Sequence, residues 1–131
     1  MKGATYHVQL NVSDLEFYRA LLAYLEFRLL DEGPDHLGAT DGRITIWIMR
    51  VAPEHAHRPF HRKAVGLNHI AFRVSERAEV DRFCRDFLGP HGIPPLYGGP
   101  RKYPHYKPGY YAVYFEDPDR IKLEVVSIAV H

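Results

Sequence analysis

Polar and apolar residues alternate strictly in two short segments of the chain, and the two segments follow the same sequence pattern. In HVQLNVSD, the residues His7, Gln9 and Asn11 alternate with apolar residues. HIAFRVSE, which begins at His69, has the same spacing and also ends in Val-Ser and an acid. Alternation with a period of two is typical of a β-strand that packs one face on a core. The chain is therefore predicted to contain an internal repeat in which each copy opens on a histidine.

Apolar residues at helical spacing follow each of these strands. Ser13 with Glu16 three residues later fits a helix capping box, and Ser75 is the expected cap of the second helix. Cys84 lies on the apolar stripe of the second helix, so we interpret it as a small buried hydrophobe rather than a nucleophile. The predicted stripes are Phe17, Leu21, Tyr24 and Leu25 in the first helix, and Val80, Phe83, Cys84 and Phe87 in the second.

Three strand-like segments are predicted after each helix. They are FRLLDE, HLGAT and RITIWIMR in the first copy, and segments around PLYGG, YYAVYFE and RIKLEVVSI in the second. The polar segment between the copies has no periodicity and is interpreted as a linker. We therefore expect an α+β fold in a single domain, with tandem βαβββ modules at residues 4–51 and 66–128, a linker at 52–65, and a cupped mixed sheet.

The amino-acid composition argues against several classes of protein, among them nucleic-acid-binding and membrane proteins. The chain has 17 Lys and Arg against 16 Asp and Glu, so no strong field would attract nucleic acid or an anionic membrane. Its single cysteine excludes an internal disulfide and fits a reducing compartment. No apolar run has the length of a membrane span, and the N-terminus has no secretory signal pattern. We expect a cytoplasmic protein that binds neither nucleic acid nor membranes.

A candidate metal site follows from the placement of three residues. His7 and His69 lie at equivalent positions on the strand faces turned away from the helices, and Glu124 lies on the corresponding face of the last strand. Trp47 holds the position of Glu124 in the first copy. If the modules pair face to face, two imidazoles and a carboxylate suit a divalent Zn, Fe, Mn, Co or Ni ion with open positions. The alternative is that the histidines are only hydrogen-bonded and that Glu124 pairs with Lys122 or an arginine.

The segment RKYPHYKPGYY concentrates cations and tyrosines before the predicted strand YYAVYFE. Two interpretations stay open: a loop that closes over an anionic substrate, or an exposed loop whose tyrosines cover the edge of the core. The cations are Arg101, Lys102, His105 and Lys107.

Three stretches together resemble the vicinal oxygen chelate superfamily, which contains glyoxalases, bleomycin-resistance proteins and extradiol dioxygenases. They are HVQLNVSDLEFYRALL, LNHIAFRVS and YFEDPDRIKLEVV, and the resemblance covers residues 4–51 and 66–128. Members of this superfamily are built from paired βαβββ modules. The resemblance implies metal ligands at His7, His69 and Glu124.

Departures from the family pattern limit the activity that the resemblance implies. Glyoxalases I use a second acid on the last strand of the first module, where this chain has Trp47 or a neighbour. Tyr114 matches an inward tyrosine of fosfomycin thiol transferases, but Gln9 replaces their usual threonine and their cation-binding loop is missing. The usual turn DPDG has Arg120 in place of glycine, and a left-handed arginine there costs about 1 kcal/mol.

We expect a metal-dependent enzyme that acts on a small oxygenated molecule chelated to the metal: a lyase or isomerase, a dioxygenase, or a thiol transferase. Glu124 and Tyr114 are the expected catalytic residues. The sequence does not assign the general base, which a metal-bound hydroxide or a loop histidine such as His105 would provide. The residues expected to contact substrate are Gln9, Asn11, Trp47, His105, Tyr110 and Tyr114.

Two other functions stay open. One is a drug- or metabolite-binding protein without catalysis, of the bleomycin-resistance type, and the other is a metal-free structural or regulatory relative. Relatives of this size often place the site at a dimer interface, so the resemblance also implies a homodimer, with modules that pair within one chain or between two.

Overall fold

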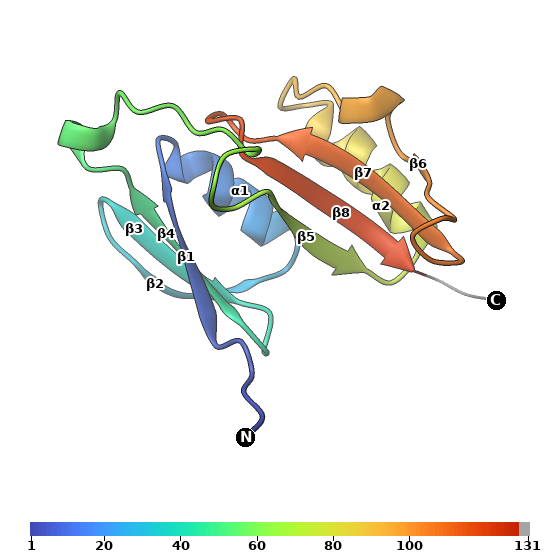
Figure 1. Ribbon diagram of the computed structural model, residues 1–131, viewed down its shortest axis with the longest axis horizontal. Coiled ribbons are helices and arrows are strands. Elements are labelled where there is room, and N and C mark those ends of the chain that lie inside the picture. Colours follow the sequence, from blue (N-terminus) through green and yellow to red (C-terminus); the bar gives the residue numbers. More distant parts are fainter. Residues whose placement is uncertain (129–131) are drawn as a thin grey trace. The chain divides into compact units, whose positions relative to one another are not determined.

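The computed structural model describes residues 1–128 and contains two βαβββ modules, each built on a four-stranded mixed sheet (Figure 1). The predicted α+β fold is therefore confirmed. The chain divides into two compact units between Pro59 and Phe60. The first module consists of β1 (His7–Val12), α1 (Leu15–Tyr24), β2 (Arg28–Glu32), β3 (His36–Thr40) and β4 (Thr45–Arg50). The second consists of β5 (His69–Val74), α2 (Arg77–Phe83) with a π-helical extension (Cys84–Leu88), β6 (Arg101–Lys102), β7 (Tyr110–Glu116) and β8 (Lys122–Ile128).

The two sheets have the same strand order, β1-β4-β3-β2 and β5-β8-β7-β6. The first and last strands of each module are parallel, and the other neighbours are antiparallel. Parallel neighbours need a long crossover, which the helix and the other strands provide. The register places Gln9 opposite Trp47 in one sheet and Ala71 opposite Glu124 in the other. Trp47 and Glu124 thus hold equivalent positions, as the repeat predicts.

In the first module, α1 packs on β3 and β4. The apolar face of α1 is buried, and so are alternate residues of β4, whereas the polar residues of β1 are exposed. The ring of Trp47 lies directly over Gly38, because a Cβ built at that glycine would come within 2.4 Å of the ring. The buried helix residues are Leu15, Phe17, Tyr18, Leu21 and Leu22.

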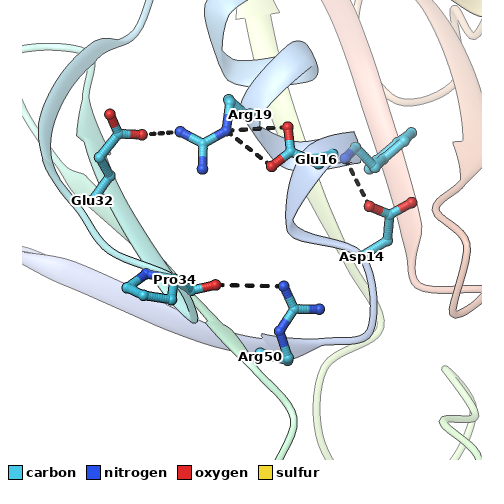
Figure 2. Close-up of polar contacts among 7 residues, drawn as sticks. Asp14, Glu16, Arg19, Glu32, Pro34 and Arg50 are labelled. Carbon is cyan, nitrogen blue, oxygen red and sulfur yellow. Dashed lines mark hydrogen bonds and ion pairs between the residues drawn. The ribbon is translucent and has the colours of Figure 1, made fainter.

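Arginine side chains connect the surface elements of the first module (Figure 2). The guanidinium of Arg19 on α1 contacts Glu16 at 3.3 Å and also pairs with Glu32 at the end of β2. Arg50, the last residue of β4, donates to the carbonyl of Pro34 at 3.5 Å. Exposed pairs of this kind contribute about 0–1 kcal/mol each, so the buried helix face is the larger stabilising term.

Both predicted helix caps were wrong by one residue. Asp14, not Ser13, caps α1, and its carboxylate accepts from the backbone N–H of Phe17 at 3.2 Å (Figure 2). The cap position of α2 is Glu76, and Ser75 donates its N–H and hydroxyl to Glu79 instead. Adjacent residues that can all act as caps make the exact start of a helix ambiguous from sequence.

The sheet of the second module is covered on both faces within its own unit. On one face, α2 packs against β7 and β8, and the ring of Phe83 stacks on Phe87 with 5.2 Å between centroids. On the other face, the segment before β7 folds back over the strands and forms a second apolar cluster. That cluster contains Tyr103, Ala112, Tyr114 and Val126, with Leu96, Tyr110 and Ile128 packed against it.

Two loop conformations were not obvious from sequence. PLYGG was predicted as a strand, but Leu96–Gly98 is a 3-10 turn, and the short strand β6 follows it. The turn before β8 keeps a left-handed residue at Arg120, with φ of 68°. The carboxylate of Asp117 accepts from the N–H of Ile121 at 2.7 Å, which holds this turn in spite of the missing glycine. Among residues 1–128, no helix has the length and apolar character of a membrane span.

Tyr111 connects β7 to α2 through its hydroxyl. The hydroxyl donates to the carboxylate of Asp81 at 2.6 Å, and the guanidinium of Arg77 lies 5.5 Å from the centre of the tyrosine ring. Burial, followed by the bond to Asp81, raises the pKa of Tyr111 to about 12. The folded protein therefore keeps a phenol proton that the unfolded chain loses near pH 10.

We predict that Tyr111→Phe lowers the free energy of unfolding by about 0.5–1 kcal/mol below pH 10, because a partly exposed hydrogen bond is lost. In the wild type this contribution declines as the pH rises from 10 to 12, so the difference between the proteins should shrink over that window. Urea unfolding at pH 8, 10 and 11 measures this difference in the free energy of unfolding. Tyr6→Phe, at an exposed tyrosine, is the control. A constant difference across the three pH values would contradict the assignment.

Candidate metal and substrate site

His69 and Glu124 lie side by side on the face of the second sheet opposite α2. His69 opens β5, and Glu124 is in the middle of β8, two pairs further along the register. The Nε2 atom of His69 is 3.2 Å from Oε1 of Glu124. Period-two alternation sends both side chains to this face, so the sequence pattern accounts for the pairing.

Glu124 is a deeply buried acid, with 1% of its surface exposed. Its other carboxylate oxygen accepts a hydrogen bond from the Tyr110 hydroxyl. Among residues 1–128, no lysine or arginine forms an ion pair with it. A buried carboxylate is costly unless a cation or several donors compensate its charge. The negative charge of the Glu124 carboxylate is therefore compensated only in part, unless a cation binds beside it or a proton is shared with His69.

Asn68 determines which nitrogen of His69 faces the acid. Its side-chain amide donates to the carbonyl of Arg62 at 3.2 Å, which turns Oδ1 toward His69. That oxygen lies 2.7 Å from Nδ1 of His69 and can only accept, so Nδ1 carries the proton. In neutral imidazole, Nε2 then presents its lone pair to the carboxylate of Glu124.

Two acceptor atoms that face each other at 3.2 Å require a positive species between them or a proton on one of them. Metal–nitrogen and metal–oxygen bonds of about 2.0–2.2 Å place adjacent ligand atoms about 3 Å apart, so the separation fits two ligands of one ion. The hydrogen bond from His69 to Asn68 is the kind of outer contact that metal-binding histidines make. His69 and Glu124 thus have the spacing and chemistry of two ligands of a divalent metal ion.

Tyrosines surround the pair. Tyr114 is buried, and its ring lies edge-on to that of His69 at 5.8 Å between centroids. Tyr110, whose hydroxyl donates to Glu124, is four residues before Tyr114 on β7, so both side chains lie on the same face of the sheet. Burial is the main cause that raises the pKa of both phenols, to about 12 for Tyr110, and the charge of Glu124 adds to it. Both hydroxyls therefore stay protonated near neutral pH and act as hydrogen-bond donors.

Tyr103 adds a buried hydroxyl without a hydrogen-bond partner among the described residues. Its ring meets Tyr114 edge-on at 5.6 Å, and the nearby charge of Glu124 contributes to its raised pKa, after burial. An unsatisfied buried hydroxyl costs about 1–3 kcal/mol, so a bound ligand with a polar atom there would be favoured.

The predicted site residues of the first module lie on the corresponding face of its own sheet. His7, Gln9 and Asn11 alternate along β1 and are exposed, and Trp47 lies opposite Gln9 on β4. The ring of Tyr6 is edge-on to His7 at 5.2 Å. The role of these residues as ligand or substrate contacts stays a prediction.

Two further predicted residues lie in the second module. His105 is exposed in the loop before β7, with its ring 4.2 Å from that of Tyr106. Cys84 is partly buried, and burial raises the pKa of its thiol to about 11, which fits its interpretation as a non-nucleophilic residue. Among residues 1–128, no group of three or more His, Cys, Asp or Glu side chains is arranged to hold a metal.

Asn68, Tyr97 and Tyr103 lie around His69 and Tyr114 but were not predicted as site residues from the sequence. The sequence signal for Asn68 was its place directly before a candidate ligand in LNHIAF, where a hydrogen-bonding residue is expected for a metal-binding histidine. Tyr97 had no such signal, because its segment was taken for a strand.

Comparisons with known protein families and with solved structures both match this chain to the same superfamily. The model of the Glyoxalase/Bleomycin resistance protein/Dioxygenase superfamily matches residues 6–125. The uncharacterized protein YqjT of Bacillus subtilis (strain 168) is 33% identical over 129 residues, which cover 93% of this chain and 97% of that protein.

Solved structures with the same fold include a candidate glyoxalase from Bacillus halodurans, with a TM-score of 0.84, 32% identity and 96% of each chain covered. The fosfomycin resistance protein FosX from Listeria monocytogenes has a TM-score of 0.71 at 19% identity, with 99% of this chain and 97% of that chain covered, and shows likeness of fold alone. With two βαβββ modules and a family match over nearly its whole length, the chain belongs to the glyoxalase/bleomycin resistance protein/dioxygenase superfamily.

Proposed function

We propose that this protein is a divalent-metal-dependent enzyme that acts on a small oxygenated molecule. The observation that carries the proposal is the buried carboxylate of Glu124, which faces the lone-pair nitrogen of His69 at 3.2 Å and has no lysine or arginine partner among residues 1–128. The superfamily consists mostly of metalloenzymes, which agrees with this donor set. His7 is proposed as the third protein ligand, on the basis of its equivalent place in the repeat.

The metal, when bound, would polarise two neighbouring oxygens of the substrate and stabilise oxyanion charge that develops there. Zn, Fe, Mn, Co and Ni all accept two imidazoles and one carboxylate. The reaction would be of the lyase or isomerase, dioxygenase, or thiol transferase type.

Each side chain around the proposed metal has a different role. Asn68 holds His69 with Nε2 available, and Tyr110 holds Glu124 by a hydrogen bond to one oxygen. Tyr114 would orient substrate oxygens with its protonated hydroxyl, and the surrounding tyrosine rings would exclude water. In the first module, Gln9, Asn11 and Trp47 are proposed substrate contacts.

A drug- or metabolite-binding role without catalysis is the second candidate. Tyrosine rings around the site, together with the unsatisfied Tyr103 hydroxyl, suit a ligand with aromatic and polar parts. In that case a proton would lie between His69 and Glu124. We also propose a cytoplasmic homodimer, from the single cysteine and the family resemblance, and the molecular mass in solution would test the dimer.

We predict that protein purified without a histidine tag retains about one divalent metal ion per chain, and that His69→Ala and Glu124→Gln each lower the metal content at least about tenfold, since each removes a ligand. Elemental analysis by mass spectrometry measures the content. His7→Ala tests the third ligand in the same way.

His36→Ala is the matched control for this measurement. Nε2 of His36 lies 3.1 Å from Asp31 in an exposed histidine–acid pair of the first module, so this variant should keep the metal content of the wild type. Near-zero metal in the wild type, unchanged in Glu124→Gln, would exclude the metalloenzyme and favour the binding role. Circular dichroism checks that each variant is folded.

Asn68→Leu is predicted to weaken metal binding about 10- to 100-fold, because His69 loses the acceptor that fixes its tautomer. Asn68→Asp keeps an acceptor in that place and should retain most of the affinity. Nitrogen-15 chemical shifts of the His69 ring report the tautomer directly. A proton that stays on Nδ1 in Asn68→Leu would show that Asn68 does not hold the tautomer.

A further inference from the structure

A lysine without a carboxylate partner lies beside the His69–Glu124 pair. Lys122 is opposite His69 in the register and two residues before Glu124, on the same face of β8. Its ammonium nitrogen is 4.7 Å from the ring centre of Tyr114 and 4.9 Å from that of Tyr97. Among residues 1–128, no carboxylate forms an ion pair with Lys122.

The nearest candidate partner on the neighbouring strand is already occupied. Glu116 is opposite Lys122 on β7, but its carboxylate pairs with Arg62 and lies 3.5 Å from Nε of Arg120. The two ring faces attract the ammonium of Lys122 but leave several of its N–H donors unused. The lysine is partly exposed, so its positive charge is available to a group bound on this face of the sheet.

Tyr97 is held over Lys122 by an unusual backbone. Its φ of 57° is left-handed, and Gly98 and Gly99 follow with positive φ as well. The guanidinium of Arg101 donates to the Tyr97 carbonyl at 3.2 Å, which helps to hold the turn. A left-handed conformation costs a tyrosine energy, and such strain is often retained at binding sites. A hydrogen bond from Lys122, with smaller effects of its charge and of Arg62, lowers the pKa of Tyr97 against the effect of burial.

We propose that Lys122 and Tyr97 form a subsite for an oxyanion group of the substrate: a carboxylate, phosphonate or phosphate. This inference rests on the proposed function and adds the substrate class, a small molecule with an anionic group beside its chelating oxygens. A divalent ion at His69 and Glu124 would outweigh the charge of Glu124, so the face would carry surplus positive charge next to Lys122. The ammonium and the phenol would both donate to the anion.

Titration calorimetry with methylphosphonate tests the subsite, with metal-free and metal-loaded protein. We expect Lys122→Met to bind this probe at least about tenfold more weakly than wild type, because a charge-assisted hydrogen bond is lost. Tyr97→Phe should bind about threefold more weakly. Lys122→Arg keeps the charge and should bind within about threefold of wild type.

Lys63→Met is the control, since it removes an exposed lysine of the same compact unit. The neutral ester dimethyl methylphosphonate should not bind. Equal affinity of wild type and Lys122→Met, or no methylphosphonate binding by wild type in either metal state, would overturn the subsite.

The same experiment separates this inference from the proposed function. Binding that depends on Lys122 in a protein that retains no metal would support the subsite and remove the metal-dependent reaction. Metal content that depends on Glu124, without probe binding that depends on Lys122, would remove the subsite alone. The metal content of Lys122→Met should equal that of wild type, which also shows that this variant is folded around His69 and Glu124.

Discussion

The buried carboxylate of Glu124 is the constraint on which the polar structure of the second module depends. A carboxylate removed from water needs compensation, and the surrounding groups provide it in part through Tyr110 and His69. Asn68 in turn fixes the orientation of His69. Since several groups are arranged around this one acid, the arrangement has the connected character of a binding centre rather than of an isolated surface ion pair.

The two modules share one framework but differ in the side chains on the sheet face opposite the helix. In each, a strand with an initial histidine lies parallel to the last strand, and one helix covers the opposite face. At the equivalent position on the last strand, the first module has Trp47, stacked over Gly38, and the second has Glu124. The two modules thus share a backbone arrangement but differ in side chains, and the acid and the tyrosines belong to the second module.

Membership of the superfamily establishes the fold and leaves the reaction open, because folds of this kind carry many different activities. The local features of this chain are a phenol that donates to the buried acid, a left-handed Tyr97, and a lysine without an acidic partner among residues 1–128. These features support the proposal of a negatively charged small molecule as substrate.

The sequence by itself determined the order of elements, the repeat and the face on which His69 and Glu124 lie, because strand alternation and helical spacing are local properties of the chain. It missed the cap at Asp14 by one residue and the turn at Tyr97 altogether, since competing caps and left-handed residues depend on neighbouring structure. Only the tertiary structure decided that Asn68 orients His69, that the Tyr110 hydroxyl donates to Glu124, and that Lys122 forms no ion pair with a carboxylate among residues 1–128. These relations depend on strand register and loop path, which bring together side chains that no local periodicity connects.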